Sequence, residues 1–226
     1  MSQEKLVTAI VLKKQILGEI DELVTVYSKE AGKLRALAVS AKLPRSRLQP
    51  HLQPLNIVKL RLVGRALPKI AGVELIQSHP LLWEQPEKLQ ALWVVIELLL
   101  RSTADEEANE GVFQSAEAVL DSLLNQDTIL ALCKFKVELL RALGWLPPYP
   151  VNGENIFIFK EGRFKSIGAG TLLSPESIRT YQSLHERTGG DLPGESFEEL
   201  NFLMQDFIEY QLERKLNAEK LRQKLV

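Results

Sequence analysis

The sequence predicts an α+β protein in which a small β domain precedes a mainly α-helical domain. Residues 1–80 contain short runs of alternating apolar and polar residues, the period of a strand. Residues 81–226 instead repeat apolar residues every three or four positions, as amphipathic helices do. The charge changes at the same point: the first 80 residues hold 13 Lys and Arg against 6 Asp and Glu, and the remainder holds 15 against 23. We therefore expect two domains, 1–80 and 81–226.

Five strands are expected in the first domain. The second and third form a hairpin, because Gly32 supplies a turn residue between two alternating runs. No segment between the strands is long enough for a crossover helix, so a closed or nearly closed five-stranded barrel such as the OB-fold is the favoured architecture. The strands are expected at 7–12, 23–28, 33–39, 56–64 and 69–77.

Three helices are expected next. The first is expected from Trp83 to Arg101, and Pro86 near its start suits a first helical turn. The capping-box pattern Thr103-Ala104-Asp105-Glu106 predicts the start of a second helix. Asp127 is placed to cap a third, which Gly144 and the prolines beyond it end.

The pattern then changes to that of a β-hairpin. Residues 155–159 and 164–167 flank the turn 160–163 and predict a small, isolated hairpin within the second domain, around 155–167. Ser174 and Pro175 predict the start of another helix that stops at Gly189-Gly190. The last long helix is expected to open at Ser196.

Motifs for catalysis or cofactor binding do not occur in the sequence. It has no phosphate-binding glycine loop, histidine-carboxylate metal motif or nucleophile elbow, so we expect neither an enzyme nor a cofactor. The single cysteine, Cys133, excludes an intramolecular disulfide and is expected to be a buried, inert thiol in a helix. Glu19, Asp21 and Glu22 resemble an acidic site, but a solvated cluster at a strand end is the simpler interpretation.

The sequence contains no segment suited to crossing a membrane. Its densest apolar stretch, 91–100, is interrupted by Glu97 and falls far short of the roughly 20 residues that a spanning helix needs. The N-terminal apolar run is also too brief for a signal peptide. We therefore expect a cytoplasmic protein without a membrane partner.

The basic residues of the first domain predict a nucleic-acid interface. Alternation places two cations on the outward face of each of two strands, and three more lie in the loop between them. On an OB-fold, the sheet face and its loops form a groove that follows single strands. Exposed aromatic residues are scarce here, so backbone charge is expected to contribute more than base stacking. The predicted DNA-binding residues are Lys33, Arg35, Lys42, Arg45, Arg47, Lys59 and Arg61.

At this point the sequence resembles a known family, the RecO recombination mediators of bacteria. The resemblance begins with Ile10-Val11-Leu12 and Gly18-Glu19 and includes the hairpin Val24 to Arg35. It continues through Ser40-Ala41-Lys42 and Leu52-Gln53-Pro54-Leu55. It extends to the helix that ends in Leu143-Gly144-Trp145 and to the closing segment 215–221. The order and spacing of these pieces, rather than any one of them, carry the resemblance over nearly the whole chain.

The resemblance implies an N-terminal OB-fold, a helical C-terminal domain and no turnover of a small molecule. Such proteins bind single- and double-stranded DNA and anneal complementary strands. With RecR they help to load the recombinase RecA onto DNA coated by the single-stranded DNA-binding protein. This resemblance also places the protein at the bacterial nucleoid.

The chain departs from the family pattern in one segment. Many family members carry a four-cysteine zinc site after the segment that corresponds to Leu143-Gly144-Trp145, but residues 145–173 of this chain contain no cysteine. Because zinc needs about four soft or imidazole ligands, we expect a metal-free hairpin. Packing of Phe157, Phe159 and Phe164 would then hold it together.

A partner site follows from the same resemblance. The single-stranded DNA-binding protein ends in an acidic tail with a C-terminal phenylalanine, a ligand that needs an apolar pocket rimmed by cations. Lys134 and Arg141 lie two turns apart on one helix, and Arg179 lies on the next. We expect Lys134 with Arg141 or Arg179 to hold the carboxylates; the alternative is that these are snorkelling surface residues.

One alternative to a DNA-binding mediator remains open. The barrel could have lost DNA affinity and serve as a protein-interaction scaffold without enzymatic activity. The basic face favours the mediator, whereas the scarce aromatics and the acidic second domain keep the scaffold possible.

Overall fold

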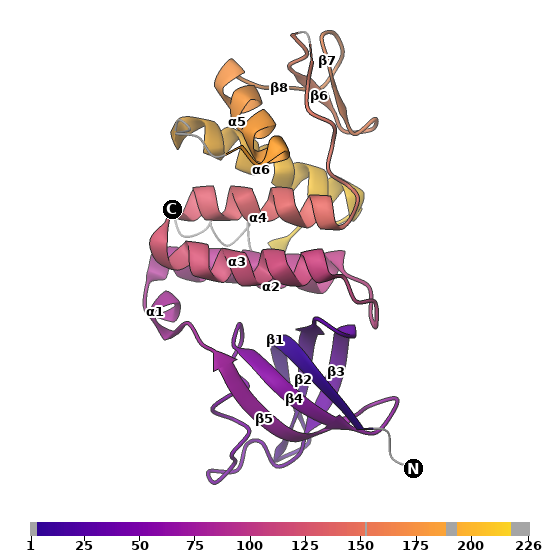
Figure 1. Ribbon diagram of the computed structural model, residues 1–226, viewed down its shortest axis with the longest axis vertical. Helices are drawn as coiled ribbons and strands as arrows, with labels where there is room; N and C mark the ends of the chain where they lie inside the picture. The colour runs from indigo at the N-terminus through magenta and orange to yellow at the C-terminus, as the bar shows by residue number, and fades with distance from the viewer. Residues whose placement is uncertain (1–3, 152, 189–193, 218–226) are drawn as a thin grey trace. The chain divides into compact units, whose positions relative to one another are not determined.

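The protein is described by a computed structural model that covers residues 4–151, 153–188 and 194–217 (Figure 1). The chain divides into two compact units, and the boundary along the chain lies between Phe113 and Gln114. The first contains a β-barrel and two helices, and the second contains further helices and a small sheet.

Five strands close the barrel: β1 (Glu4–Leu17), β2 (Asp21–Ser28), β3 (Gly32–Ala38), β4 (Ile57–Val63) and β5 (Lys69–Gln77). Their order around the barrel is β1-β2-β3-β5-β4, with β4 returning to β1. All neighbours are antiparallel except β3 and β5, which meet in parallel through the single pair Leu37 and Lys69. This arrangement confirms the expected OB-fold. Apolar residues from all five strands fill the barrel, among them Val7, Val11, Val26, Ala36, Leu60 and Ile70.

Strand β1 is longer than the sequence predicts because it serves two neighbours in turn. Its first half pairs with β4 and its second half pairs with β2 as far as Leu17. The register shifts between Val11 and Lys13, which marks the bend between the two halves. The polar residues from Lys13 onward therefore continue the strand instead of ending it.

Two helices follow the barrel, α1 (Pro80–Trp83) and α2 (Pro86–Ser102), and Pro86 occupies the first turn as predicted. The predicted helix start at Thr103 is wrong. The Thr103 hydroxyl donates to the Leu99 carbonyl at the end of α2, at 2.6 Å, so it is unavailable as a cap for a following helix. Helix α3 (Glu110–Asn125) begins later, where the Asn109 side chain accepts from the Val112 amide at 3.2 Å.

The segment 103–109 lies against the β2–β3 hairpin. The Tyr27 hydroxyl, which is fully buried, bonds with the backbone of Asn109. Gly32 has a φ of +67°, as its predicted turn position requires, and a Cβ built on it would lie 2.1 Å from the Glu107 carbonyl oxygen. Only glycine satisfies both the positive φ and this close approach.

In the second unit α4 (Thr128–Ala142), α5 (Pro175–Glu186) and α6 (Gly194–Gln211) pack against one another, and the later part of α3 belongs to the same unit. Asp127 caps α4 as predicted, since its carboxylate accepts from the amides of Ile129 and Leu130. Helix α5 ends at Glu186, and Arg187 follows in the left-handed conformation at φ 58°. The predicted stop at Gly189-Gly190 lies outside the described residues. Helix α6 opens at Gly194, two residues before the expected Ser196.

The small sheet has three strands, so the prediction of an isolated hairpin is wrong. Strands β6 (Ile156–Ile158) and β7 (Arg163–Lys165) form the expected hairpin, and β8 (Thr171–Leu172) pairs with the other edge of β6. The third strand was missed because two residues are too few to show a period. The predicted phenylalanine packing is confirmed: Phe157 lies edge-on to Phe159, Phe164 and also Phe207 of α6, at centroid distances of 5.0 to 5.2 Å.

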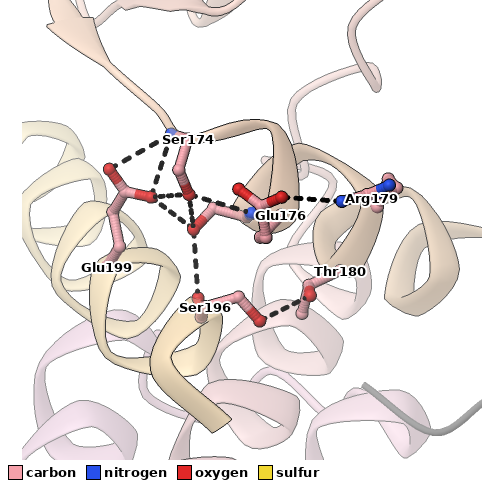
Figure 2. A network of polar contacts seen from close by, with 7 residues as sticks. Ser174, Glu176, Arg179, Thr180, Ser196 and Glu199 are labelled. Carbon is pink, nitrogen blue, oxygen red and sulfur yellow. Dashed lines mark hydrogen bonds and ion pairs between the residues drawn. The ribbon is translucent and has the colours of Figure 1, made fainter. Parts of the chain in front are cut away.

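A polar network joins the start of α5 to α6 (Figure 2). Ser174 caps α5 as predicted by accepting from the Ser177 amide at 3.2 Å. The Glu199 carboxylate of α6 accepts from the Ser174 amide and from the hydroxyls of Ser174 and Ser177. Beside this carboxylate, the hydroxyl groups of Thr180 and Ser196 form a hydrogen bond of 2.7 Å. The network fixes the two helix starts against each other.

Candidate nucleic-acid interface

The strand cations have the orientation that alternation predicts. On β3, Ala36 and Ala38 are buried in the barrel while Arg35 is exposed. On β4, Val58, Leu60 and Leu62 point inward, and Lys59 and Arg61 are exposed. The sequence therefore places each side chain on the correct side of its strand, but it does not say which of them share a surface.

Lys33 is used inside the first unit. Its ammonium group donates to the Leu100 carbonyl at 2.8 Å and to the Thr103 carbonyl at 2.6 Å, and it lies 3.4 Å from the Asp105 carboxylate. Only 13% of its side chain is exposed. A cation at the carboxyl end of a helix satisfies the last carbonyls and complements the helix dipole. We therefore leave Lys33 out of the proposed interface.

Lys59 and Arg61 lie on a different face from Arg35. Strand β4 pairs with the first half of β1 and with β5, whereas β3 pairs with β2. Acidic residues accompany both β4 cations: Arg61 lies 3.7 Å from the Glu4 carboxylate, and Lys59 is the register partner of Glu74 on β5. The predicted residues thus divide between two faces of the barrel.

The connection between β3 and β4 carries Lys42, Arg45 and Arg47, all exposed. Its beginning is fastened to the β1–β2 turn, because the Lys42 amide donates to the Ile20 carbonyl at 3.0 Å. The Ser40 amide donates to the Asp21 carboxylate at 2.7 Å. Lys42 is therefore held beside the end of the β1–β2 hairpin.

The outward face of β1, β2 and β3 brings Arg35 next to a lysine that sequence reasoning missed. The register aligns Lys13 with Thr25, and Thr25 with Arg35, so the three residues form one row across the strands. We define this row with Lys42 as the β1–β3 cationic face. Lys13 was overlooked because it follows the irregularity in β1, and only the pairing with β2 shows which way it points.

A groove borders this face where the barrel is held by the single β3–β5 pair. It has a volume of about 930 Å³ and is lined in part by Leu23 and Arg35. Lys5 from β1 and Arg65 from the β4–β5 connection also line it, and neither was predicted. Glu30, Asp105 and Glu106 lie on its wall as well, so the groove has mixed charge.

The second unit contains an apolar pocket of about 450 Å³ between α3, α4, α5 and α6. Lys134 lines it, as does Arg187, which lies 2.7 Å from the Glu138 carboxylate and was not predicted. Arg141 instead donates to the carbonyls of Leu184 and His185, both at 3.0 Å. Arg179 is exposed, pairs with Glu176 and does not line the pocket. Only Lys134 of the three predicted residues lines it.

The remaining candidate sites do not point to catalysis. Asp21 is occupied by the Ser40 amide, and the described part of the chain holds no group of three His, Cys, Asp or Glu residues arranged to bind a metal. Cys133 is buried as predicted, and burial raises the pKa of its thiol to about 12. The thiol is therefore protonated at neutral pH. Among the helices described, none has the length and apolarity to span a bilayer.

Two family descriptions together match most of this chain. "Recombination protein O N terminal" matches residues 1–79, and "Recombination protein O C terminal" matches residues 84–220. The chain belongs to the RecO family. The family assignment agrees with the closed β1-β2-β3-β5-β4 barrel and the helices that follow it.

Curated relatives carry the printed name DNA repair protein RecO. The protein of Pelotomaculum thermopropionicum is 31% identical over 140 residues, which is 62% of this chain and 55% of the relative. That of Desulfitobacterium hafniense is 28% identical over 140 residues, 62% of this chain and 51% of the relative. That of Koribacter versatilis is 30% identical over 142 residues, which is 62% of this chain and 58% of the relative. The alignments therefore span about half the length of these relatives.

Proposed function

We propose that this RecO-family chain is a non-enzymatic DNA repair protein that binds and anneals single-stranded DNA during recombination. The observation that carries the proposal is the β1–β3 cationic face, where Lys13 and Arg35 share one row and Lys42 lies at the nearby hairpin end. Within the described ranges, none of these three side chains forms an ion pair with a carboxylate. Their charge is therefore available for phosphates, together with that of Arg45 and Arg47.

Phosphate contacts explain how such a face promotes annealing. Each cation that neutralises a phosphate releases a counterion, and two strands with reduced charge approach each other more readily. This step makes and breaks no covalent bond, so it needs no nucleotide triphosphate. Double-stranded DNA presents the same phosphates and is expected to bind as well.

A salt-dependent fluorescence titration with a labelled single-stranded oligonucleotide tests the proposal. The logarithm of the affinity should fall linearly with the logarithm of the salt concentration, by about 0.7 for each phosphate contacted. No binding at low salt would contradict the DNA assignment and would favour the protein-interaction scaffold.

A second proposal concerns the pocket of the second unit, which has the chemistry for the acidic tail of a single-stranded DNA-binding protein. Apolar side chains such as Leu130 and Phe197 line it, and Lys134 and Arg187 supply cations. In this proposal Arg187, and not Arg141 or Arg179, accompanies Lys134. The Arg141 side chain donates to backbone carbonyls, and Arg179 does not line the pocket. Calorimetric titration with a tail peptide should give micromolar affinity, about −8 kcal/mol, and Lys134→Glu should weaken it.

Three further assignments rest on family membership alone. We infer that RecR is a partner, that the protein assists loading of the RecA recombinase, and that it acts at the nucleoid in the bacterial cytoplasm. Co-purification of RecR with the full chain tests the first of these.

A further inference from the structure

An aliphatic strip runs beside the cations on the outward face of β1, β2 and β3. The register aligns Gln15 with Leu23, and Leu23 with Leu37, one step along from the row of Lys13 and Arg35. Leu17 follows after a further step and is 45% exposed. We define the aliphatic strip as Leu17, Leu23 and Leu37.

These leucines do not belong to the barrel core. Val24 and Ala36, their neighbours in the chain, fill the core, and alternation directs Leu23 and Leu37 to the opposite side of the sheet. The same outward positions on β4 hold Lys59 and Arg61. One exposed leucine, Leu17, and two half-buried ones, Leu23 and Leu37, in place of such polar residues give this face an apolar surface that a ligand can contact.

The strip is less covered than the rest of this face. Further along β2 and β3, the segment 103–109 covers the sheet, so that Tyr27 is fully buried and Lys33 is nearly so. Toward the β1–β2 turn, Leu17 is exposed, and the half-buried Leu23 lines the groove of about 930 Å³.

The charges around the strip favour a nucleic acid over an apolar protein partner. Lys13 and Arg35 flank it on one side, and Lys42 lies near its other end, at the β1–β2 turn. Asp21, the acid on this face, is bonded to the Ser40 amide. Glu22 lies on the other side of β2, and Glu19 is exposed in the turn. From Arg35 to Leu37 is roughly 7 Å along the strand, the scale of one nucleotide.

We propose that the aliphatic strip contacts the bases of single-stranded DNA while Lys13, Arg35 and Lys42 contact its phosphates. This inference rests on the DNA-binding function proposed above. It adds which side chains contact the bases and which contact the phosphates. Leucine methyl groups contact any base without hydrogen-bond selection, so the contact is independent of sequence. The contact is also weaker than stacking on an aromatic ring. The bases can therefore leave the leucines and pair with a complementary strand.

The test compares two labelled oligomers of equal length and charge, an oligothymidylate and its abasic counterpart, by fluorescence anisotropy. The wild-type protein should bind the oligothymidylate roughly tenfold more tightly, because only this oligomer offers bases to the strip. The variant Leu17→Ser/Leu23→Ser should bring the ratio close to one. Its salt slope should stay that of the wild type, because the phosphate contacts are retained.

Two controls separate base contact from loss of the fold. Leu17→Ser alone changes a half-exposed side chain near the end of a strand, so it should fold normally and still lower the ratio. Leu75→Ser removes an exposed leucine from β5, which does not pair with β1 or β2, and should leave the ratio unchanged. Thermal unfolding of each variant checks that the barrel is intact.

The outcomes distinguish the two levels of inference. Equal affinity of the wild-type protein for both oligomers, with the salt slope intact, overturns the aliphatic strip and leaves DNA binding standing. A wild-type ratio that survives in both strip variants overturns it too, because the bases then contact another part of the protein. Failure to bind either oligomer at low salt contradicts the proposed function itself.

Discussion

At the residue scale, Lys33 is a cation that stabilises the fold by donating to backbone carbonyls. Replacing it with Met would leave the carbonyls of Leu100 and Thr103 without their charged donor. We expect Lys33→Met to lower the free energy of unfolding by about 1–3 kcal/mol, measured by urea denaturation. The slope of DNA affinity against salt should not change, because the ammonium group does not face solvent.

Lys13→Met is the matched control for that substitution. Lys13 is exposed on the same face, one row away from Lys33. Its loss should change the free energy of unfolding by no more than about 0.5 kcal/mol and should flatten the salt slope by roughly 0.7. The reverse pattern, with Lys33 affecting the slope and Lys13 the stability, would contradict this division of roles.

Glu199 makes the second unit sensitive to acid. Partial burial alone would raise the pKa of its carboxyl group, but hydrogen bonds from the Ser174 and Ser177 hydroxyls and the Ser174 amide lower it, and the resulting pKa lies below the ordinary value of a glutamate (Figure 2). A group with a depressed pKa contributes stability above its unfolded value and loses it as the pH falls through the folded one.

Thermal unfolding at pH 7 and pH 3 should therefore show a smaller acid-induced fall in Tm for Glu199→Gln than for the wild type. Glu176→Gln is the control, because Glu176 is exposed at the same helix start and bonds only to the Arg179 side chain among the contacts described. An equal fall in all three proteins would show that the Glu199 network does not set the acid response.

At the element scale, the small sheet depends on aromatic packing. Phe157 is fully buried and touches Phe159, Phe164 and Phe207 at centroid distances near 5 Å. We expect Phe157→Ala to destabilise the second unit by about 3–5 kcal/mol, whereas Phe159→Leu should cost less.

Overnight treatment with a metal chelator should leave the wild-type Tm unchanged. A fall in Tm with chelator, restored by zinc, would show that a metal ion contributes.

The β3–β4 connection is the element predicted to add most to phosphate binding. Changing Lys42, Arg45 and Arg47 together to Ala should flatten the salt slope by about 2 units, because three exposed cations are lost. Lys59→Ala/Arg61→Ala provides the comparison. These two cations lie on the outward face of β4, where Glu4 and Glu74 already accompany them. A smaller effect there than in the connection would place the DNA path over β1–β3.

Local patterns predict elements well and fail where a distant residue intervenes. Alternation identified five strands, and Asp127 and Ser174 were recognised as caps because capping depends on neighbours a few residues away. Thr103 carries an equally good local signal but bonds backward to α2, and the following segment joins the β2–β3 hairpin. No sequence window around Thr103 contains that information.

At the scale of the whole molecule, the candidate site could be predicted only in part for the same reason. The outward direction of Arg35, Lys59 and Arg61 follows from a period of two. The loss of Lys33 to carbonyl partners 67 and 70 residues away does not. Nor does the grouping of Lys13 with Arg35, which requires the register of three strands and the irregularity in β1.

The uneven charge of the chain leads to the last prediction. Residues 1–80 carry a net charge of +7 and the remainder carries −8, so we expect DNA to be attracted to the part of the chain that contains the barrel. Strands bound in this way repel each other less, and complementary oligonucleotides should anneal faster with the protein than without it, in the absence of nucleotide triphosphate. Stopped-flow fluorescence quenching of a labelled pair measures the rate. The acceleration should decline as salt rises, and the charge reversal Lys13→Glu/Arg35→Glu should reduce it more than Lys59→Glu/Arg61→Glu. If the wild-type protein gives no acceleration at low salt although the oligonucleotides bind, annealing is not its activity, and the barrel acts through binding alone.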